Sequence, residues 1–264
     1  MGAPLAGQPR PSSALGSLAW TRQTGGVLRG RDRWTLLAEA ARYGLAVLPS
    51  EVRRALGIAR HRGADVDPVA LRPPDSAAAR EAERIIEAFA PPMVVNHGYR
   101  TYAWGAALAA NERRSFDREV VYVASLLHDL YWSAPDAMAS PHCFTLPAAE
   151  DAIALGARCG WNQARAQAAA EAITLHLNIM PPSASDEAYV VFVGARLDII
   201  GYRYRDLAAD TVDRVLGHYP RLNFKQQSLE GFENQSRANP GTRVHFHTRI
   251  LRSKWFCMHA PFDE

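Results

Sequence analysis

Several features that would point directly to a function are missing from this chain of 264 residues. It has only three cysteines, Cys143, Cys159 and Cys257, and no two are close in sequence. This count argues against a disulfide scaffold or a cysteine-based zinc site and fits a reducing compartment. Lysine is almost absent, and the arginines are scattered rather than gathered into a basic stripe typical of nucleic-acid binders. We therefore expect no nucleic-acid partner.

Long apolar segments are missing as well. No run approaches the ~20 residues that span a bilayer, and the stretch from Ala14 to Trp20 is interrupted by Gly16 and Ser17, so no signal peptide is predicted. Gly-x-Gly-x-x-Gly, Walker, Gly-x-Ser-x-Gly and His-Glu-x-x-His motifs are also absent. We expect a cytoplasmic protein without a membrane partner that acts on a small molecule. Whether it forms a homo-oligomer is left open.

What the sequence does contain is a series of helical patterns separated by short turns, with almost no alternation of period two. The fold class is therefore predicted to be all-α, a helical bundle with a small helical or disordered N-terminal extension. We divide the chain into an extension, 1–74, with a disordered tail and short helices; a main domain, 75–220; and a C-terminal extension, 221–264, packed on that domain.

Within the N-terminal extension, residues 1 to about 30 are rich in Gly, Pro, Ser and Ala and are expected to form a mobile tail. Two helices are predicted over 33–48 and 51–59, and the proline-containing segment 61–74 is expected to be a linker. Near the other end, residues 243–249 alternate like a strand, although no partner strand is evident.

The most unusual stretch is 122–130, an apolar helix that ends in the adjacent side chains of His128 and Asp129. Burying a charge costs several kcal/mol unless it is paired or bound to a metal, so these groups require partners. The candidates are His97 near the start of one predicted helix, His176 at the end of another, and Asp198 within a third. Ligands in helical bundles come from different helices, so this set predicts a metal site.

Each of these residues has a plainer interpretation when taken singly. A histidine at a helix end is more often a cap or a surface group, and Asp198 could pair with Arg196 or Arg203. Small residues beside Asp198, at Gly194 and Gly201 among others, would nevertheless let a neighbouring helix bring its ligands close. The metal-site hypothesis thus depends on the combination.

The order of His97, then His128-Asp129, then Asp198 on consecutive helices resembles the HD-domain superfamily of metal-dependent hydrolases. Four segments are similar to the cyanamide hydratase branch of that superfamily: NHGYRTYAWG at 96–105, ASLLHDL at 124–130, AITLH at 172–176 and LDIIG at 197–201. The resemblance spans roughly residues 75–216 and identifies 75–220 as an HD metal-binding domain. One departure is Thr145, which stands where the branch carries an acidic residue.

The resemblance implies that His97, His128, Asp129 and Asp198 hold one divalent metal. Two imidazoles and two carboxylates suit zinc, our first choice, and also iron(II) or manganese. A bound metal lowers the pKa of its water to about 7, which would provide hydroxide to attack a small polar substrate, such as a nitrile like cyanamide giving a urea. Asp129 and His176 are predicted to be catalytic, His176 as a proton shuttle or substrate contact.

Two further residues are predicted to support the site or contact the substrate. Asn96 would orient a ligand, and Arg100 would pair with Asp129 or Asp198, with a structural salt bridge as the preferred interpretation. The loop 131–141 could cover the site from above.

A single metal is favoured because only His142 and His176 lie between the HD pair and Asp198. Two other functions stay open. One is an HD phosphohydrolase acting on a nucleotide or phosphoester, and the other is a non-catalytic metal- or ligand-binding protein.

Overall fold

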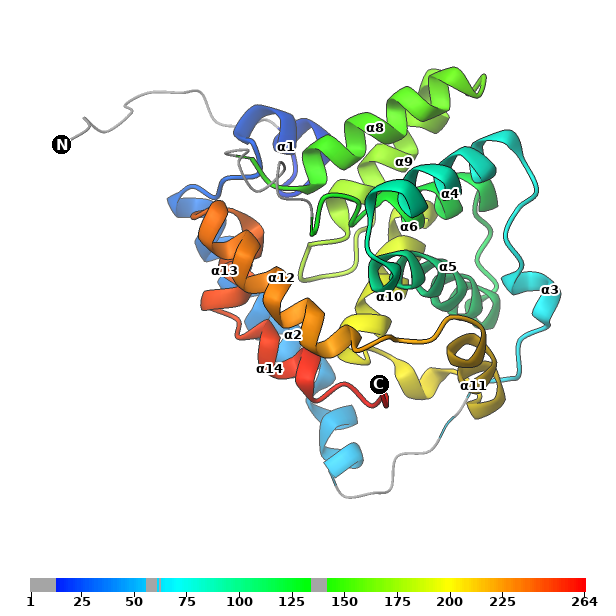
Figure 1. Ribbon diagram of the computed structural model, residues 1–264. Coiled ribbons are helices and arrows are strands. Elements are labelled where there is room, and N and C mark those ends of the chain that lie inside the picture. Colours follow the sequence, from blue (N-terminus) through cyan, green and yellow to red (C-terminus); the bar gives the residue numbers. More distant parts are fainter. Residues whose placement is uncertain (1–12, 56–60, 62, 134–141) are drawn as a thin grey trace.

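The computed structural model describes residues 13–55, 61, 63–133 and 142–264. Across these residues the regular structure is helical, and the only β-type pairing is an isolated bridge between Val27 and Thr242. The prediction of an all-α fold is therefore confirmed. Figure 1 shows α5 and α10 near the middle of the molecule, with α4, α6, α8 and α9 on one side and α12, α13 and α14 on the other.

The described helices follow one another as α1 Leu18–Thr24, α2 Gly30–Ala55, α3 Pro68–Leu71, α4 Ala77–Phe89, α5 Pro92–Glu112, α6 Arg118–Leu127, α8 Thr145–Arg158, α9 Gln163–Leu175, α10 Asp186–Ile200, the 3-10 turn Tyr204–Asp206, α11 Ala209–His218, α12 Phe224–Ala238, α13 Arg243–Arg249 and α14 Ser253–Met258.

Helices α5 and α10 cross closely because glycine lies at the contact. A Cβ atom added to Gly194 would lie 2.0 Å from the backbone oxygen of Thr101, and one added to Gly105 would lie 2.4 Å from that of Val190. Only glycine permits this approach. The close contact predicted beside Asp198 is thus confirmed at Gly194, whereas Gly201 ends α10 in the left-handed conformation (φ 72°).

Helix α6 lies in the core. Its N-terminus is capped by Asp117, whose carboxylate accepts hydrogen bonds from the backbone N–H groups of Glu119 and Val120 at 3.1 and 3.2 Å. Every residue of α6 from Val120 to Leu127 is buried. The helix ends at Leu127, so His128 and Asp129 come at its C-terminus, as predicted.

The N-terminal region differs from its prediction in two ways. Where a mobile tail was expected, Leu18–Thr24 forms α1, because Ser17 caps it and Trp20 is buried. The backbone N–H of Leu18 also donates to Glu171 of α9. The two helices predicted over 33–48 and 51–59 are one helix, α2, which continues through Pro49 to Ala55; residues 56–60 lie outside the described part.

The strand-like alternation over 243–249 is misleading, because these residues form α13. Their buried side chains pack on α12, and the hydroxyl of Thr248 donates to the carbonyl of Phe232 at 3.4 Å. The alternation of polar and apolar residues over seven positions fits a short helix half-buried against another helix as well as it fits a strand.

Residues from both predicted extensions lie against the central helices. Phe262 stacks on Trp104 of α5 with ring centroids 6.1 Å apart. Val66 and Leu71, from the segment expected to be a linker, are buried in the same apolar cluster as Trp104. The boundaries at residues 74 and 220 stay a prediction.

Candidate metal centre

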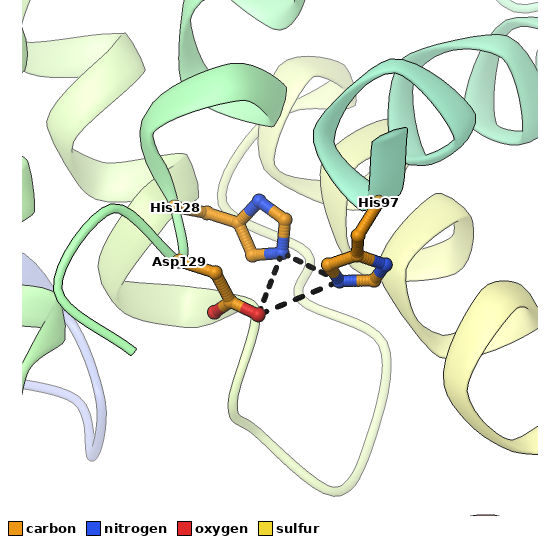
Figure 2. Close-up of side chains that lie close together, drawn as sticks. All are labelled: His97, His128 and Asp129. Carbon is orange, nitrogen blue, oxygen red and sulfur yellow. Dashed lines mark hydrogen bonds and ion pairs between the residues drawn. The ribbon is translucent and has the colours of Figure 1, made fainter. Parts of the chain in front are cut away.

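Three side chains from two helices meet at one point (Figure 2). His97 lies in the second turn of α5, and His128 and Asp129 follow the last residue of α6. Nε2 of His97 is 3.1 Å from Nε2 of His128, and Oδ2 of Asp129 lies 3.4 and 3.5 Å from these two nitrogens. Within the described residues, these three form a group whose ligand atoms lie within 4.8 Å of one another.

Hydrogen bonds on the far side of each ring determine which imidazole nitrogen is available. Nδ1 of His128 donates to the carbonyl of Ser125 at 2.7 Å, and Nδ1 of His97 donates to a carboxylate oxygen of Asp198 at 2.7 Å. In the neutral rings the Nε2 atoms therefore carry lone pairs, and these lone pairs face each other across 3.1 Å. Such an arrangement requires a proton or a cation between them.

His176, at the end of α9, adds a third imidazole to this point. Its Nδ1 donates to the carbonyl of Ile173 at 2.6 Å, and its Nε2 lies 3.5 Å from Oδ1 of Asp129. Oδ1 of Asp129 is buried and accepts no hydrogen bond from the described residues. Three Nε2 lone pairs and an incompletely satisfied carboxylate form a donor set that suits a divalent cation such as zinc.

Asp198 lies behind His97 rather than beside the other donors. Its Oδ2 accepts the Nδ1–H of His97 and the Nη2–H of Arg100 at 2.9 Å, while its Oδ1 accepts from Nε of Arg100 at 2.8 Å. Arg100 is therefore the salt-bridge partner of Asp198, one of the two partners expected for it. In this structure Asp198 fixes the ring of His97, as carboxylates do for histidines that ligate metals.

A second arginine, which no sequence pattern indicated, also binds Asp198. Nη1 of Arg221 donates to Oδ1 of Asp198 at 2.9 Å, and its Nε donates to Glu264 at 3.1 Å. Nε1 of Trp104, which is buried in the core, also donates to Oδ1 at 3.2 Å. We call Asp198, Arg100, Arg221 and Glu264 the Asp198 clamp.

Asn96, predicted to orient a ligand, has a different contact. Its side-chain amide donates to the carbonyl of Pro220 at 2.8 Å, and Nη1 of Arg100 donates to the same carbonyl at 3.0 Å. Asn96 thus stabilises the segment before Arg221, which in turn contacts Asp198.

Burial and charge act in opposite directions on the ionisable groups here. Burial alone raises the pKa of the Asp198 carboxyl, but the guanidinium groups of Arg100 and Arg221 hold it well below its usual range. Burial lowers the pKa of His128, and burial together with the charge of His128 lowers that of His176 to about 3. Burial also lowers the pKa of His97, yet its bonds to Asp129 and Asp198 raise it overall.

Of the two carboxylates, Asp129 is the one whose negative charge is not balanced by arginine. Asp198 is neutralised by two arginines, whereas among the described residues the charged partners of the Asp129 carboxylate are imidazoles. A cation would therefore be attracted to Asp129 much more than to Asp198.

A cavity of about 80 Å³ opens beside the cluster. It is bounded on one side by His97, His128, Asp129 and His176, and its other walls are mainly apolar, formed by Trp132, Phe144, Ala195, Ile199, Ile200 and Phe232. Trp132 belongs to the loop 131–141 that was predicted to cover the site, of which residues 134–141 lie outside the described part. Pockets for drug-sized ligands occupy roughly 300–1,000 Å³, so this one admits a molecule of only a few non-hydrogen atoms.

Comparison with known proteins gives a distant match. No family model matches the chain. Over 189 residues it is 25% identical to cyanamide hydratase DDI2 and, equally, to cyanamide hydratase DDI3, both of Saccharomyces cerevisiae. The alignments cover 70% of this chain and 82% of each relative. At the coarsest level, this similarity supports a hydratase-like enzyme.

The helices that the structure describes include none that is both long and apolar enough to cross a membrane.

Proposed function

We propose that this protein is a metal-dependent hydratase of the HD-domain type that adds water to a small nitrile such as cyanamide, giving a urea. The observation that carries the proposal is the convergence of three imidazole Nε2 atoms on Asp129 at the wall of a small cavity. The distant similarity to two cyanamide hydratases agrees with it.

In this proposal His97, His128 and Asp129 hold the cation, and zinc is our first choice over iron(II) and manganese. When bound, such a cation lowers the pKa of water and polarises the substrate. Asp198, predicted from the sequence as a fourth ligand, instead acts on Nδ1 of His97. It keeps the ring in the tautomer whose Nε2 faces Asp129.

His176 moves the proton. Its Nδ1–H is held by the carbonyl of Ile173, so its Nε2 lone pair is directed to the cluster. As the water oxygen bonds to the nitrile carbon, one proton passes to Nε2 of His176 and from there to the nitrile nitrogen. The remaining hydrogen then shifts from oxygen to nitrogen and gives the amide. Asp129 accepts hydrogen bonds that orient the attacking water.

The cavity restricts the substrate. At about 80 Å³ it has room for cyanamide or another nitrile of a few non-hydrogen atoms, and its aromatic and aliphatic walls suit an uncharged molecule. A phosphoester would instead need cationic groups beside the cluster. Arg100 and Arg221 are committed to Asp198, which leaves Arg196 as the one arginine among the described residues that line the cavity. A single arginine beside the cluster favours the hydratase over the phosphohydrolase.

The first test is metal content and urea formation. Protein purified without a metal-affinity step is analysed by elemental mass spectrometry and then incubated with cyanamide while urea is measured. We expect about one zinc or iron per chain and urea formation that a chelator abolishes. His128→Ala should lose both metal and activity.

His218→Ala is the matched control, because His218 is an exposed histidine at the end of α11. It should keep both metal and activity. Metal without urea would refute cyanamide as the substrate but leave the centre intact. A protein that takes up no metal after supplementation and forms no urea would refute the proposal as a whole.

A further inference from the structure

Helix α2 presents a long apolar face to solvent. Its opposite face is attached to the body of the protein: Leu36 is buried, and the ring of Tyr43 lies 5.7 Å from that of Tyr202 and under the guanidinium of Arg196. The outward side chains include Trp34, Leu45 and Leu48, which are 74%, 72% and 55% exposed. A monomer rarely leaves so many large apolar groups in one row uncovered.

The row has helical spacing. At 100° per residue, the positions within about 60° of one line along α2 are all apolar or glycine. We call those between residues 34 and 52 the α2 stripe: Trp34, Leu37, Ala38, Ala41, Gly44, Leu45, Leu48 and Val52. Every member is exposed, and the stripe runs for roughly 27 Å at 1.5 Å per residue.

The stripe is complementary to itself. In an antiparallel pair of α2 helices related by a two-fold axis beside residue 43, residues equally distant from that position lie opposite each other. Leu45 then faces Ala41 of the second copy, and Leu48 faces Ala38. In these two central pairs a bulky side chain meets a small one, which allows the two helices to interdigitate at close range. At the ends, Trp34 meets Val52.

The surface beside the stripe continues the apolar face. A groove of about 420 Å³ lies between α2 and α13, and its lining includes Trp34, Leu37, Phe246 and the half-exposed Ile250. At roughly 100 Å² for each large exposed side chain and less for each alanine, the stripe and Ile250 offer about 700 Å². One partner of a standard stable interface contributes about 800 Å², so the area is close to what a dimer needs.

We propose that the α2 stripe is the dimer interface of this protein, with a second copy of the chain bound antiparallel along α2. The proposal does not depend on the proposed function. The small residues in the centre of the stripe favour a second helix over a lipid surface, because insertion into lipid would favour bulky side chains there.

The test is the molar mass of the full chain in solution, measured by size-exclusion chromatography with light scattering at micromolar concentration. Wild type should have the mass of two chains. Leu45→Glu places a charge at the centre of the interface and should raise the dimer dissociation constant at least about 100-fold. The control is Phe89→Glu on α4, because Phe89 is 73% exposed and lies outside the stripe. It should stay dimeric.

A double variant tests the antiparallel register. Ala41→Arg combined with Leu45→Glu brings opposite charges together on both sides of the two-fold axis, so the dimer should return. A monomeric wild type, or a Leu45→Glu variant that stays dimeric, would overturn the proposal. So would a double variant that stays monomeric. A wild-type monomer that sediments with vesicles of phosphatidylcholine and phosphatidylglycerol would assign the stripe to a lipid surface instead.

Discussion

Replacing Asp198 by asparagine removes a buried negative charge and keeps the volume of the side chain. The carboxylate accepts hydrogen bonds from two guanidinium groups, those of Arg100 and Arg221, and all three side chains are almost fully inaccessible to water. Because the arginine charges hold the pKa of Asp198 well below its usual range, the carboxylate is ionised at neutral pH. Asp198→Asn therefore removes the ion pair of the buried Arg100 and leaves the buried Arg221 with Glu264 as its carboxylate partner.

The expected cost is large. Removing one member of a buried ion pair typically destabilises a protein by about 3–5 kcal/mol, since the remaining charge is left uncompensated. Arg100 loses its ion pair in this variant, whereas Arg221 keeps Glu264, so we expect a cost within that range. Arg221→Met should cost less, because Asp198 keeps its two hydrogen bonds to Arg100. The double variant Asp198→Asn/Arg221→Met should lose less free energy of unfolding than the two single variants lose together. Each substitution removes a charge that the other substitution deprives of a partner.

The assay is urea denaturation of the metal-free proteins, followed by circular dichroism. Metal-free protein separates the two interpretations of Asp198. If it belongs to the clamp, Asp198→Asn lowers the free energy of unfolding without any metal present. If it is a metal ligand, removing its charge in the metal-free protein costs little and mainly weakens metal binding. A metal-free Asp198→Asn that is as stable as wild type would refute the clamp.

Three further predictions concern other parts of the molecule. Gly194→Ala should lower the free energy of unfolding, measured by urea denaturation, by at least about 2 kcal/mol, because the added Cβ meets the Thr101 backbone. The control is Gly217→Ala, where the added Cβ lies in open space; it should leave the free energy of unfolding unchanged or raise it by up to about 1 kcal/mol. Burial and the charge of Arg196 lower the pKa of His247 to about 3, so the unfolded chain takes up a proton below about pH 6.5 that the folded chain does not. Stability should fall as the pH decreases, and His247→Gln should reduce that fall by about 1–2 kcal/mol between pH 7 and pH 5; an unchanged pH profile would contradict the shift. Chelation should lower the melting temperature of the wild type but leave that of His128→Ala unchanged.

The helices around the site could be predicted because their signals are local. Ser76 and Asp117 cap α4 and α6 as their positions before apolar segments indicate, and His128 and Asp129 fall at the end of α6 as the pattern requires. Pro49 was a misleading local signal, since α2 continues through it.

The interior of the site could be predicted only in part. The sequence predicted Asp198 as a further metal ligand and as a possible partner of Arg100, but it did not indicate the hydrogen bond from Nδ1 of His97 to Asp198. Arg221 carries no sequence signal at all: it follows Pro220 in a segment without helical pattern, and its partners lie in α10 and at residue 264. Contacts between residues that are distant in sequence depend on how the helices pack, and periodicity does not encode that packing.

The Asp198 clamp has a consequence for how this protein can be divided. A fragment that ended with α11 would contain His97, the His-Asp pair, His176 and Asp198, and would look complete as a set of ligands. It would lack Arg221 and Glu264, and with them half of the charge that holds Asp198 against His97. The predicted unit 75–220 is therefore not expected to fold and function by itself. As an isolated fragment it should be less stable than the full chain, and the side chains of its metal centre should be less well ordered.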